Sequence, residues 1–367
     1  MIKIKREILY LFKLNHVTIS IYVLFFSVLI ASCKQNNGVQ LTLPPQIYCN
    51  NISEMSIYFD NLIEVQNRGE YTFKITPDLG KKDSTKYTFH IHEKEAHNYK
   101  LNVAVFDKLG KKVAAESTTL YYTLLTKIPA DTINILLTGN SLTNAGYFAA
   151  RVKSLFTDTL NFPVKFLGTR KNHGGIHEGY GGKTWKWFTQ NGKSPFVFNL
   201  AEGDTTLHFK HYFENVVNTS PDYVVVELGI NDCFRADTSS VAAIDSTIDE
   251  MLKYTTVYLE NLIEYKNDIQ IGVCLVPAAN SNASGFIANY GDKYTQSGWT
   301  KIQRRVNKRY IDFFKKNFNS NCSLIPLQIN IDTYNAYPAD NGVHPKPEGY
   351  YQFASTIFSW LFYKIEE

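Results

Sequence analysis

From residue 133 onward, short apolar runs alternate with longer stretches of helical periodicity. The apolar runs cover residues 133–137, 164–167, 223–228, 269–275 and 323–327. The helical stretches cover residues 145–156, 207–217, 241–264, 299–318 and 347–363. Apolar runs of this length are typical of strands buried on both faces, and such strands joined through helices form a parallel sheet. The pattern therefore predicts an α/β domain of three layers, with helices on both sides of the sheet.

Residues 46–128 follow a different pattern. Runs in which apolar and polar side chains alternate are separated by turn clusters and cover residues 71–75, 86–92, 100–106 and 117–122. Alternation with frequent turns and no long helical stretch is typical of antiparallel sheets. We therefore expect a smaller, Ig-like all-β sandwich at 46–128 and the α/β domain at 131–367, with the boundary at Pro129 and Ala130.

The first 32 residues resemble the signal peptide of a bacterial lipoprotein. Basic residues precede an apolar run at 17–30, which is short for a membrane span, and small residues then lead to Cys33. The resemblance implies cleavage before Cys33 and a lipid anchor on its thiol. It places the chain in the bacterial cell envelope, either periplasmic or exposed on the outer membrane. An ordinary signal peptide with an incidental cysteine is the alternative. Residues 33–45 are expected to form a polar tether.

Charge and cysteine content exclude several classes of function. The chain has 38 Lys and Arg residues against 34 Asp and Glu residues, a net charge of +4. This excess is too small for a protein that neutralises nucleic acid phosphates, so no nucleic acid partner is expected. The four cysteines beyond Cys33 form no Cys-x-x-Cys pair, which speaks against zinc and dithiol redox motifs. We expect neither a metal nor another cofactor.

Residues with catalytic chemistry follow three of the predicted strands. The first strand leads into Gly-Asn-Ser-Leu at 139–142, and the third leads into Gly-Ile-Asn-Asp at 229–232. After the fifth strand, His344 stands shortly before the last helix. Ligands of open parallel sheets bind at the carboxyl ends of the strands. There, a serine at a strand-to-helix turn can be a nucleophile, an amide can hold an oxyanion, and an imidazole can act as a base.

Ser, Gly, Asn and His, in this order and each after a different strand, resemble the SGNH, or GDSL-like, hydrolase family. The glycine of the family's second block corresponds to Gly182, and the resemblance covers residues 132–364. It implies a flavodoxin-like three-layer hydrolase domain and serine ester hydrolysis. In that reaction Ser141 attacks the acyl carbon and His344 accepts its proton. The amides of Ser141 and Gly182 and the side chain of Asn231 would form the oxyanion hole.

The chain departs from the family pattern at two positions. Asn140 stands in place of the usual Asp of the first block and keeps the ability to cap the turn. The family places its acid three residues before the histidine, where this chain has Asn341, with Asp340 one residue further back. Either a local bulge lets Asp340 reach His344, or Asn341 or a backbone carbonyl orients the ring and the site works as a Ser-His dyad. We take Asp340 as the candidate acid.

Aromatic side chains crowd the predicted site loops. Aromatic faces at a polar cleft suit stacking on sugar rings, so Tyr180, Trp185 and Tyr290 are candidates for substrate binding, although Trp185 could equally belong to the core. An envelope location, an accessory β domain and the family resemblance together favour acylated carbohydrate as the substrate. We expect a serine esterase that removes short acyl groups, O-acetyl above all. The alternatives are a lysophospholipase or thioesterase, or a non-catalytic glycan-binding surface lipoprotein.

Overall fold

The computed structural model describes residues 39–65, 67–201, 204–318 and 321–367. The predicted signal peptide and Cys33 lie outside these residues. Residues 41–367 group into one compact unit. Within the described ranges, none of the helices combines the length and the apolar character that crossing a membrane requires.

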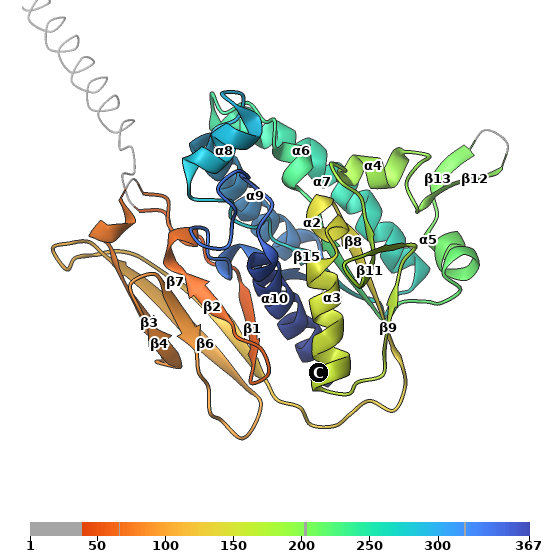
Figure 1. The fold of residues 1–367 in the computed structure, drawn as a ribbon, viewed down its shortest axis with the longest axis horizontal. Helices are drawn as coiled ribbons and strands as arrows, with labels where there is room; N and C mark the ends of the chain where they lie inside the picture. Colours follow the sequence, from red (N-terminus) through yellow and green to blue (C-terminus); the bar gives the residue numbers. More distant parts are fainter. Residues whose placement is uncertain (1–38, 66, 202–203, 319–320) are drawn as a thin grey trace, which may run out of the picture. The chain divides into compact units, whose positions relative to one another are not determined.

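The centre of the α/β part is a seven-stranded sheet in which all pairings but one are parallel (Figure 1). In spatial order its strands are β10 (Arg170–Asn172), β11 (Gly175–Gly179), β8 (Ile133–Gly139), β14 (Tyr223–Glu227), β15 (Gln270–Cys274) and β16 (Cys322–Ile325), and β9 (Val164–Leu167) also pairs with β8. The antiparallel exception is the β10–β11 hairpin. The predicted parallel sheet is therefore confirmed.

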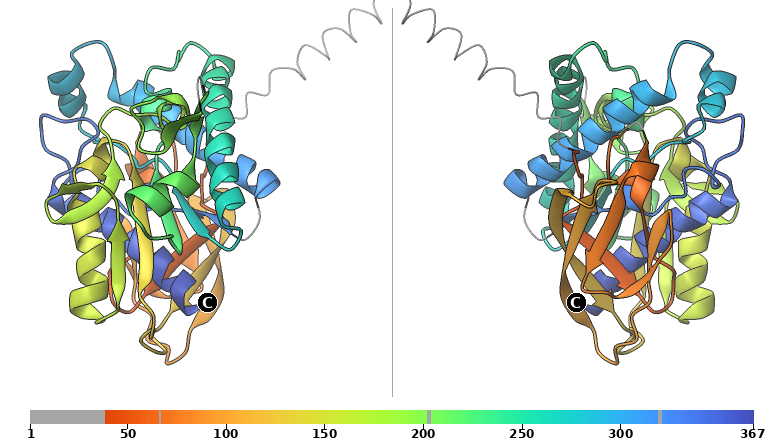
Figure 2. Two further views of the ribbon diagram at one scale, coloured as in Figure 1. Left: turned by 90° about the vertical axis from the view of Figure 1, so that its right-hand side faces the viewer. Right: turned by 90° about the vertical axis from the view of Figure 1, so that its left-hand side faces the viewer.

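Helices cover both faces of this sheet (Figures 1 and 2). On one face α3 (Tyr147–Ser154) packs against α10 (Pro347–Glu366). On the other face α7 (Val241–Tyr265) packs against α4 (Trp185–Gln190) and α9 (Gln296–Asn317). The shorter helices are α2 (Ser141–Asn144), α5 (Phe209–His211), α6 (Ile230–Cys233) and α8 (Ala283–Tyr290), with single π-helical turns at Leu155–Thr159 and Tyr212–Val216. The three layers agree with the prediction.

The helix predicted at 145–156 begins earlier and is interrupted. Gly146 separates α2 from α3 and has a φ of +79°, which an L-residue rarely adopts. A Cβ atom at this position would also lie 2.1 Å from the backbone oxygen of Asn172. The β10–β11 hairpin can therefore pack close to the helix only because residue 146 has no side chain. The break turns α2 into a separate four-residue helix that begins at Ser141.

The N-terminal part consists of two sheets. The larger has the order β1 (Gln46–Asn50), β7 (Lys112–Thr123), β6 (His97–Phe106) and β3 (Thr72–Thr76), and the smaller has the order β2 (Ser56–Tyr58), β5 (Lys86–Phe89) and β4 (Gly80–Lys82). All pairings are antiparallel except the parallel pair of β1 with β7. This part also contains 3-10 turns at Phe59–Asn61 and Arg68–Glu70. The short elements of the α/β part not yet named are the hairpin of β12 (Val197–Ala201) and β13 (Asp204–Leu207) and a 3-10 turn at Leu327–Ile329.

The sequence pattern does not predict strands β1 and β2, because both are buried over most of their length. All three residues of β2 and the three central residues of β1 are buried, so neither strand alternates between apolar and polar side chains. The predicted boundary at Pro129 and Ala130 falls in the connection between β7 and β8, and the residues on both sides of it belong to the same compact unit. Independent folding of the two parts stays a prediction.

The last helix, α10, joins the two parts because it contacts both. On its inner side the Trp360 indole packs over β15, where a Cβ atom at Gly272 would lie 2.9 Å from Trp360 Cη2. On its outer side Asn50 of β1 donates to Ser359 Oγ at 2.8 Å, and the ring of Tyr363 lies 5.3 Å from that of Tyr48. A helix with neighbours on both sides buries apolar side chains on more than one face, which explains the mostly apolar stretch from Phe353 to Phe362.

Candidate active site

The carboxyl ends of the parallel strands bring the predicted site residues to one edge of the sheet. Ser141 follows β8, and Asn231 follows β14, the neighbour of β8. The loop at 180–184 follows β11, which pairs with the other edge of β8. Tyr180 donates its backbone N–H to the Gly139 oxygen at 2.9 Å, so this loop begins beside the nucleophile turn.

Ser141 and His344 form a hydrogen bond across 203 residues of sequence. The distance from Ser141 Oγ to His344 Nε2 is 2.8 Å. Ser141 is the first residue of α2, and the N-cap Asn140 accepts the Leu142 N–H at 2.9 Å, which holds the turn. His344 stands just before α10. This is the distance at which a serine hydroxyl can donate its proton to an imidazole base.

Asn341 sets the tautomer of the His344 ring. Its Oδ1 accepts the backbone N–H groups of Val343 at 3.1 Å and His344 at 2.9 Å, so this atom must be the amide oxygen. The same Oδ1 lies 3.2 Å from His344 Nδ1. Because an amide oxygen only accepts, Nδ1 carries the ring hydrogen and Nε2 keeps its lone pair for the Ser141 hydroxyl.

Asp340, the candidate acid from the sequence, does not contact the ring. Its side chain is exposed, and no hydrogen bond or ion pair reaches it among the described residues. The expectation that Asp340 orients His344 is therefore corrected. The physical reason is the tight turn from Asn341 to His344, which turns the Asn341 side chain back onto the ring and leaves the preceding residue facing solvent.

Burial lowers the pKa of His344 below its ordinary value. Burial disfavours the charged imidazolium, and the group beside Nδ1 is a neutral amide, not a carboxylate that would offset this effect. The ring is therefore neutral at neutral pH, which is the form that can accept a proton from Ser141.

Asn231 and Gly182, the predicted oxyanion-hole donors, belong to two segments that contact each other beside the nucleophile turn. Asn231 Nδ2 donates one hydrogen to the Lys183 oxygen at 3.0 Å, which leaves its second amide hydrogen for another acceptor. Gly182 has a φ of +72°, a conformation that favours glycine. A Cβ atom at Gly181 would lie 4.0 Å from Ser141 Cβ, so this glycine pair borders the nucleophile.

Glu227 is a site residue that the sequence reading missed. It ends β14, is fully buried, and its Oε1 accepts from Asn140 Nδ2 at 3.0 Å while its backbone oxygen accepts the Asn140 N–H at 3.1 Å. Burial raises the pKa of Glu227 to about 8. Asn140 therefore connects the nucleophile turn to a buried carboxyl group, and an Asp at this position would bring a second carboxyl group next to it. A lone Glu in an otherwise apolar strand was the available signal.

The three aromatic candidates occupy different environments. Tyr180 is half-buried, and the Arg170 guanidinium carbon lies 4.7 Å from its ring centroid. Trp185 is fully buried and donates Nε1–H to Tyr310 at 2.7 Å, so it is a core residue, and the expectation that it binds substrate is corrected. Tyr290 is half-buried in an aromatic cluster on α8, with its ring 5.0 Å from that of Phe234.

We expect the substitution Glu227→Gln to change how the free energy of unfolding depends on pH. The pKa of Glu227 is raised from 4.5 to about 8 in the folded protein, so between these values the folded state binds more protons than the unfolded state. The protonated Glu227 carboxyl group contributes fully to the free energy of unfolding below pH 4.5, and this contribution is lost as the pH rises through 8. Urea unfolding at pH 5, 7 and 9 should show wild type losing stability relative to Glu227→Gln by up to several kcal/mol.

The exposed Glu214→Gln is the matched control and should follow wild type at every pH. Parallel stability curves for wild type and Glu227→Gln would contradict the raised pKa.

Comparison with known proteins identifies the family of the chain. The profile of the GDSL-like Lipase/Acylhydrolase family matches residues 130–357, and a search of curated proteins found no match. Similar solved structures include a family 3 carbohydrate esterase from Clostridium thermocellum, at 16% identity and a TM-score of 0.42, covering 64% of this chain and 96% of that one. A family 3 carbohydrate esterase from Talaromyces cellulolyticus has 16% identity and a TM-score of 0.44, covering 64% and 98%.

The matched region contains the whole central sheet, and it includes both Ser141 and His344. Because the family profile spans more than half of the sequence, the chain belongs to the GDSL-like lipase/acylhydrolase family, the SGNH hydrolases.

Proposed function

We propose that this protein is a serine esterase that removes short acyl groups, above all O-acetyl groups, from carbohydrate. The observation that carries the proposal is the 2.8 Å contact between Ser141 Oγ and His344 Nε2, together with a ring whose tautomer leaves Nε2 free to accept a proton. A non-catalytic surface protein has no need of this arrangement. The contact therefore favours an enzyme over a protein that only binds glycans.

In the proposed reaction, Ser141 Oγ attacks the acyl carbon while its proton moves to His344 Nε2. The oxyanion accepts hydrogen bonds from the amides of Ser141 and Gly182 and from the second amide hydrogen of Asn231. The imidazolium then protonates the leaving alcohol oxygen, and the acyl group remains on Ser141. Water, deprotonated by His344, attacks this acyl-enzyme and releases the carboxylic acid and the free serine.

The proposed site works without a carboxylate on the histidine. Asn341 keeps the ring in the productive orientation, but a neutral amide stabilises the imidazolium less than an ionised acid would. The site therefore combines correct geometry with a weak base. This is a Ser-His dyad with an amide as the positioning group.

Carbohydrate as the substrate is supported by the surroundings of the proposed oxyanion loop. Tyr180 is half-buried beside Trp187, with ring centroids 5.1 Å apart, and Lys183 Nζ lies 5.1 Å from the Trp187 ring. Aromatic side chains interleaved with hydrogen-bond donors suit the alternating C–H faces and hydroxyl groups of sugars.

We also propose that a lipid on Cys33 anchors the enzyme in the bacterial cell envelope. The other four cysteines are free and buried in the described part of the chain, so none of them offers an exposed thiol for acylation. An anchored enzyme would meet glycans outside the cytoplasm.

The substitution Ser141→Ala should reduce hydrolysis of 4-nitrophenyl acetate by at least about 10³-fold, because the covalent step loses its nucleophile. The exposed Ser239→Ala is the control and should retain full activity. A fluorophosphonate should label wild type and not Ser141→Ala. Turnover by Ser141→Ala at the wild-type rate would refute the proposal. A rate that rises from acetyl to octanoyl esters would instead indicate a lysophospholipase or thioesterase.

The substitution Asn341→Asp should raise kcat by about tenfold, equivalent to roughly 1.4 kcal/mol, because a carboxylate at Nδ1 stabilises the imidazolium. The same charge raises the pKa of His344, so the acidic limb of the kcat/KM profile should move to higher pH. Asp340→Asn is the matched control and should change kcat by less than about twofold, as expected for an exposed charge. A loss of tenfold or more in Asp340→Asn would show that this carboxylate reaches the ring in solution.

In bacterial cells, the full-length protein should partition with membranes and incorporate labelled fatty acid. Cys33→Ser should abolish both, whereas the control Cys322→Ser should keep them, because the Cys322 thiol is buried. Acylation that persists in Cys33→Ser would exclude the proposed anchor.

A further inference from the structure

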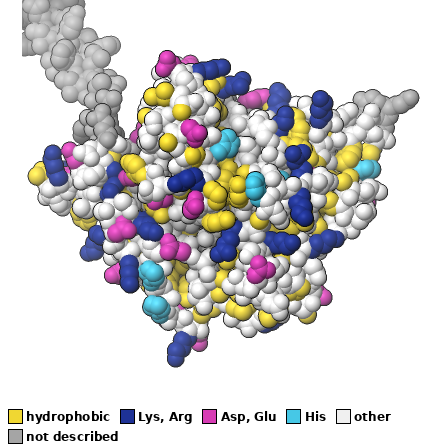
Figure 3. Space-filling view, viewed as in Figure 1, with side chains coloured by type: hydrophobic (Ala, Val, Ile, Leu, Met, Phe, Trp, Pro, Cys, Tyr) yellow, Lys and Arg dark blue, Asp and Glu magenta, His cyan; other side chains and the backbone are white. Residues whose placement is uncertain are grey.

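A cavity of about 660 Å³ lies between the α/β part and the N-terminal sheets, close in sequence to both catalytic candidates. Its lining includes Tyr147, six residues after Ser141, and Glu348, four residues after His344. Both connections are short, so the cavity begins within about 15 Å of the reacting serine. Figure 3 shows this face of the molecule, with α3 and α10 near its centre.

One side of the cavity is aromatic. The rings of Tyr147 and His173 stack with centroids 3.9 Å apart, and the Tyr351 side chain is 45% exposed. His173 occupies the turn of the β10–β11 hairpin with a φ of +44°, which a non-glycine residue adopts at a cost. Its Nδ1 lies 2.8 Å from the Ala145 oxygen, so the stack and this hydrogen bond hold the ring at the cavity.

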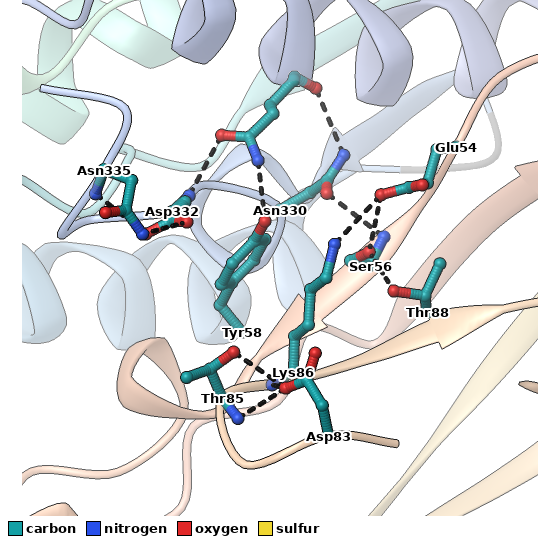
Figure 4. A network of polar contacts seen from close by, with 11 residues as sticks. Glu54, Ser56, Tyr58, Asp83, Thr85, Lys86, Thr88, Asn330, Asp332 and Asn335 are labelled. Carbon is teal, nitrogen blue, oxygen red and sulfur yellow. Dashed lines mark hydrogen bonds and ion pairs between the residues drawn. The ribbon is translucent and has the colours of Figure 1, made fainter. Parts of the chain in front are cut away.

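Amide side chains of the lining belong to a network of hydrogen bonds (Figure 4). Asn330 accepts the Ser56 N–H at 3.1 Å and donates to Thr356 Oγ1 at 3.0 Å, and Gln352 donates to the Tyr58 hydroxyl at 2.9 Å. These bonds connect the N-terminal sheets to α10 and to the segment before it. The amides that line the cavity are therefore positioned before any ligand binds.

The N-terminal part supplies one wall of the cavity through Glu54, which precedes β2. Its Oε1 accepts from Lys86 Nζ at 3.1 Å, and its side chain is 65% exposed. Arg151 also lines the cavity, with its guanidinium carbon 6.0 Å from the Tyr351 ring centroid. Charges of both signs line the cavity, which speaks against a strongly anionic or cationic ligand.

We propose that this cavity is a glycan-binding subsite that holds neutral sugar units of the chain whose acylated unit lies at Ser141. Exposed aromatic rings, planar amides and carboxylates at one concave site match the C–H faces and hydroxyl groups of pyranose rings. The cavity volume is large enough for sugar units, since pockets of 300–1,000 Å³ typically hold drug-sized ligands. The proposal rests on the proposed function and gives the N-terminal sheets a role, which is to complete the subsite.

The test compares a small substrate with polymers. 4-Nitrophenyl acetate reaches only Ser141, whereas O-acetylated xylan and O-acetylated glucomannan are neutral chains and O-acetylated pectin is an acidic one. Wild type should prefer the neutral glycans. Tyr351→Ala should lower kcat/KM on the better neutral glycan by about fivefold or more through KM, and leave 4-nitrophenyl acetate within about twofold.

Two further variants sharpen the comparison. Tyr351→Phe keeps the ring and should retain most glycan activity, while Glu54→Ala should lower it without affecting 4-nitrophenyl acetate. Tyr334→Ala is the matched control, because Tyr334 is 62% exposed and lies outside this cavity. Wild type should also be retarded in native gels that contain the deacetylated neutral polymer, and Tyr351→Ala should not.

The outcomes separate the two proposals. If wild type hydrolyses 4-nitrophenyl acetate and Tyr351→Ala has the same kcat/KM as wild type on the glycan, the subsite proposal is wrong. The esterase proposal is then unaffected. Preference for pectin overturns the neutral specificity. A wild type that hydrolyses none of the esters refutes the esterase, and the gel retardation then decides the subsite independently, since binding requires no turnover.

Discussion

Burial of α10 on two sides is the constraint on which the rest of this structure depends. The helix packs through Trp360 onto the central sheet, and through Ser359 and Tyr363 onto β1 of the N-terminal part. Removing either neighbour would expose a continuous apolar helix face to water, at about 25 cal/mol for each Å² uncovered. The two parts of the chain are therefore coupled through one helix, and this agrees with their grouping into a single compact unit.

The same helix determines where the histidine stands. His344 directly precedes α10, so its backbone position follows from the packing of that helix. The turn before it is clamped by Asn280, whose side-chain amide donates to the Asn341 backbone oxygen at 3.0 Å and whose backbone N–H donates to the Gly342 oxygen at 3.0 Å. Core packing and a local amide clamp together bring Nε2 to within 2.8 Å of Ser141 Oγ. Placement of the base thus depends both on the packing of α10 and on the amide contacts of the turn before it.

Beneath the serine, a buried polar pair replaces apolar packing. Glu227 and Asn140 hydrogen-bond each other through side chain and backbone, and burial keeps the pKa of the carboxyl group near 8. A buried carboxyl group costs stability unless it is neutral or well bonded, and here it is both at neutral pH. The pair holds the strand-to-helix turn in one conformation, and the Asn in the first sequence block supplies the donor that an ionised Asp could not.

Much of the fold and the core of the candidate site followed from the sequence alone. Apolar runs determine the parallel strands, because a strand buried on both faces must be apolar throughout, and the residues after those strands meet at one edge by topology alone. Ser141, Asn231 and His344 were selected as candidates in this way, and Gly182 through the resemblance to the family's second block. The sequence could not decide between Asp340 and Asn341, because the direction of a side chain in a tight turn depends on backbone angles that only the folded turn sets. For the same reason it could not separate Trp185, which is buried, from Tyr180, which is not. The cavity beside α10 has residues from positions 54 to 355, and tertiary packing alone brings them together.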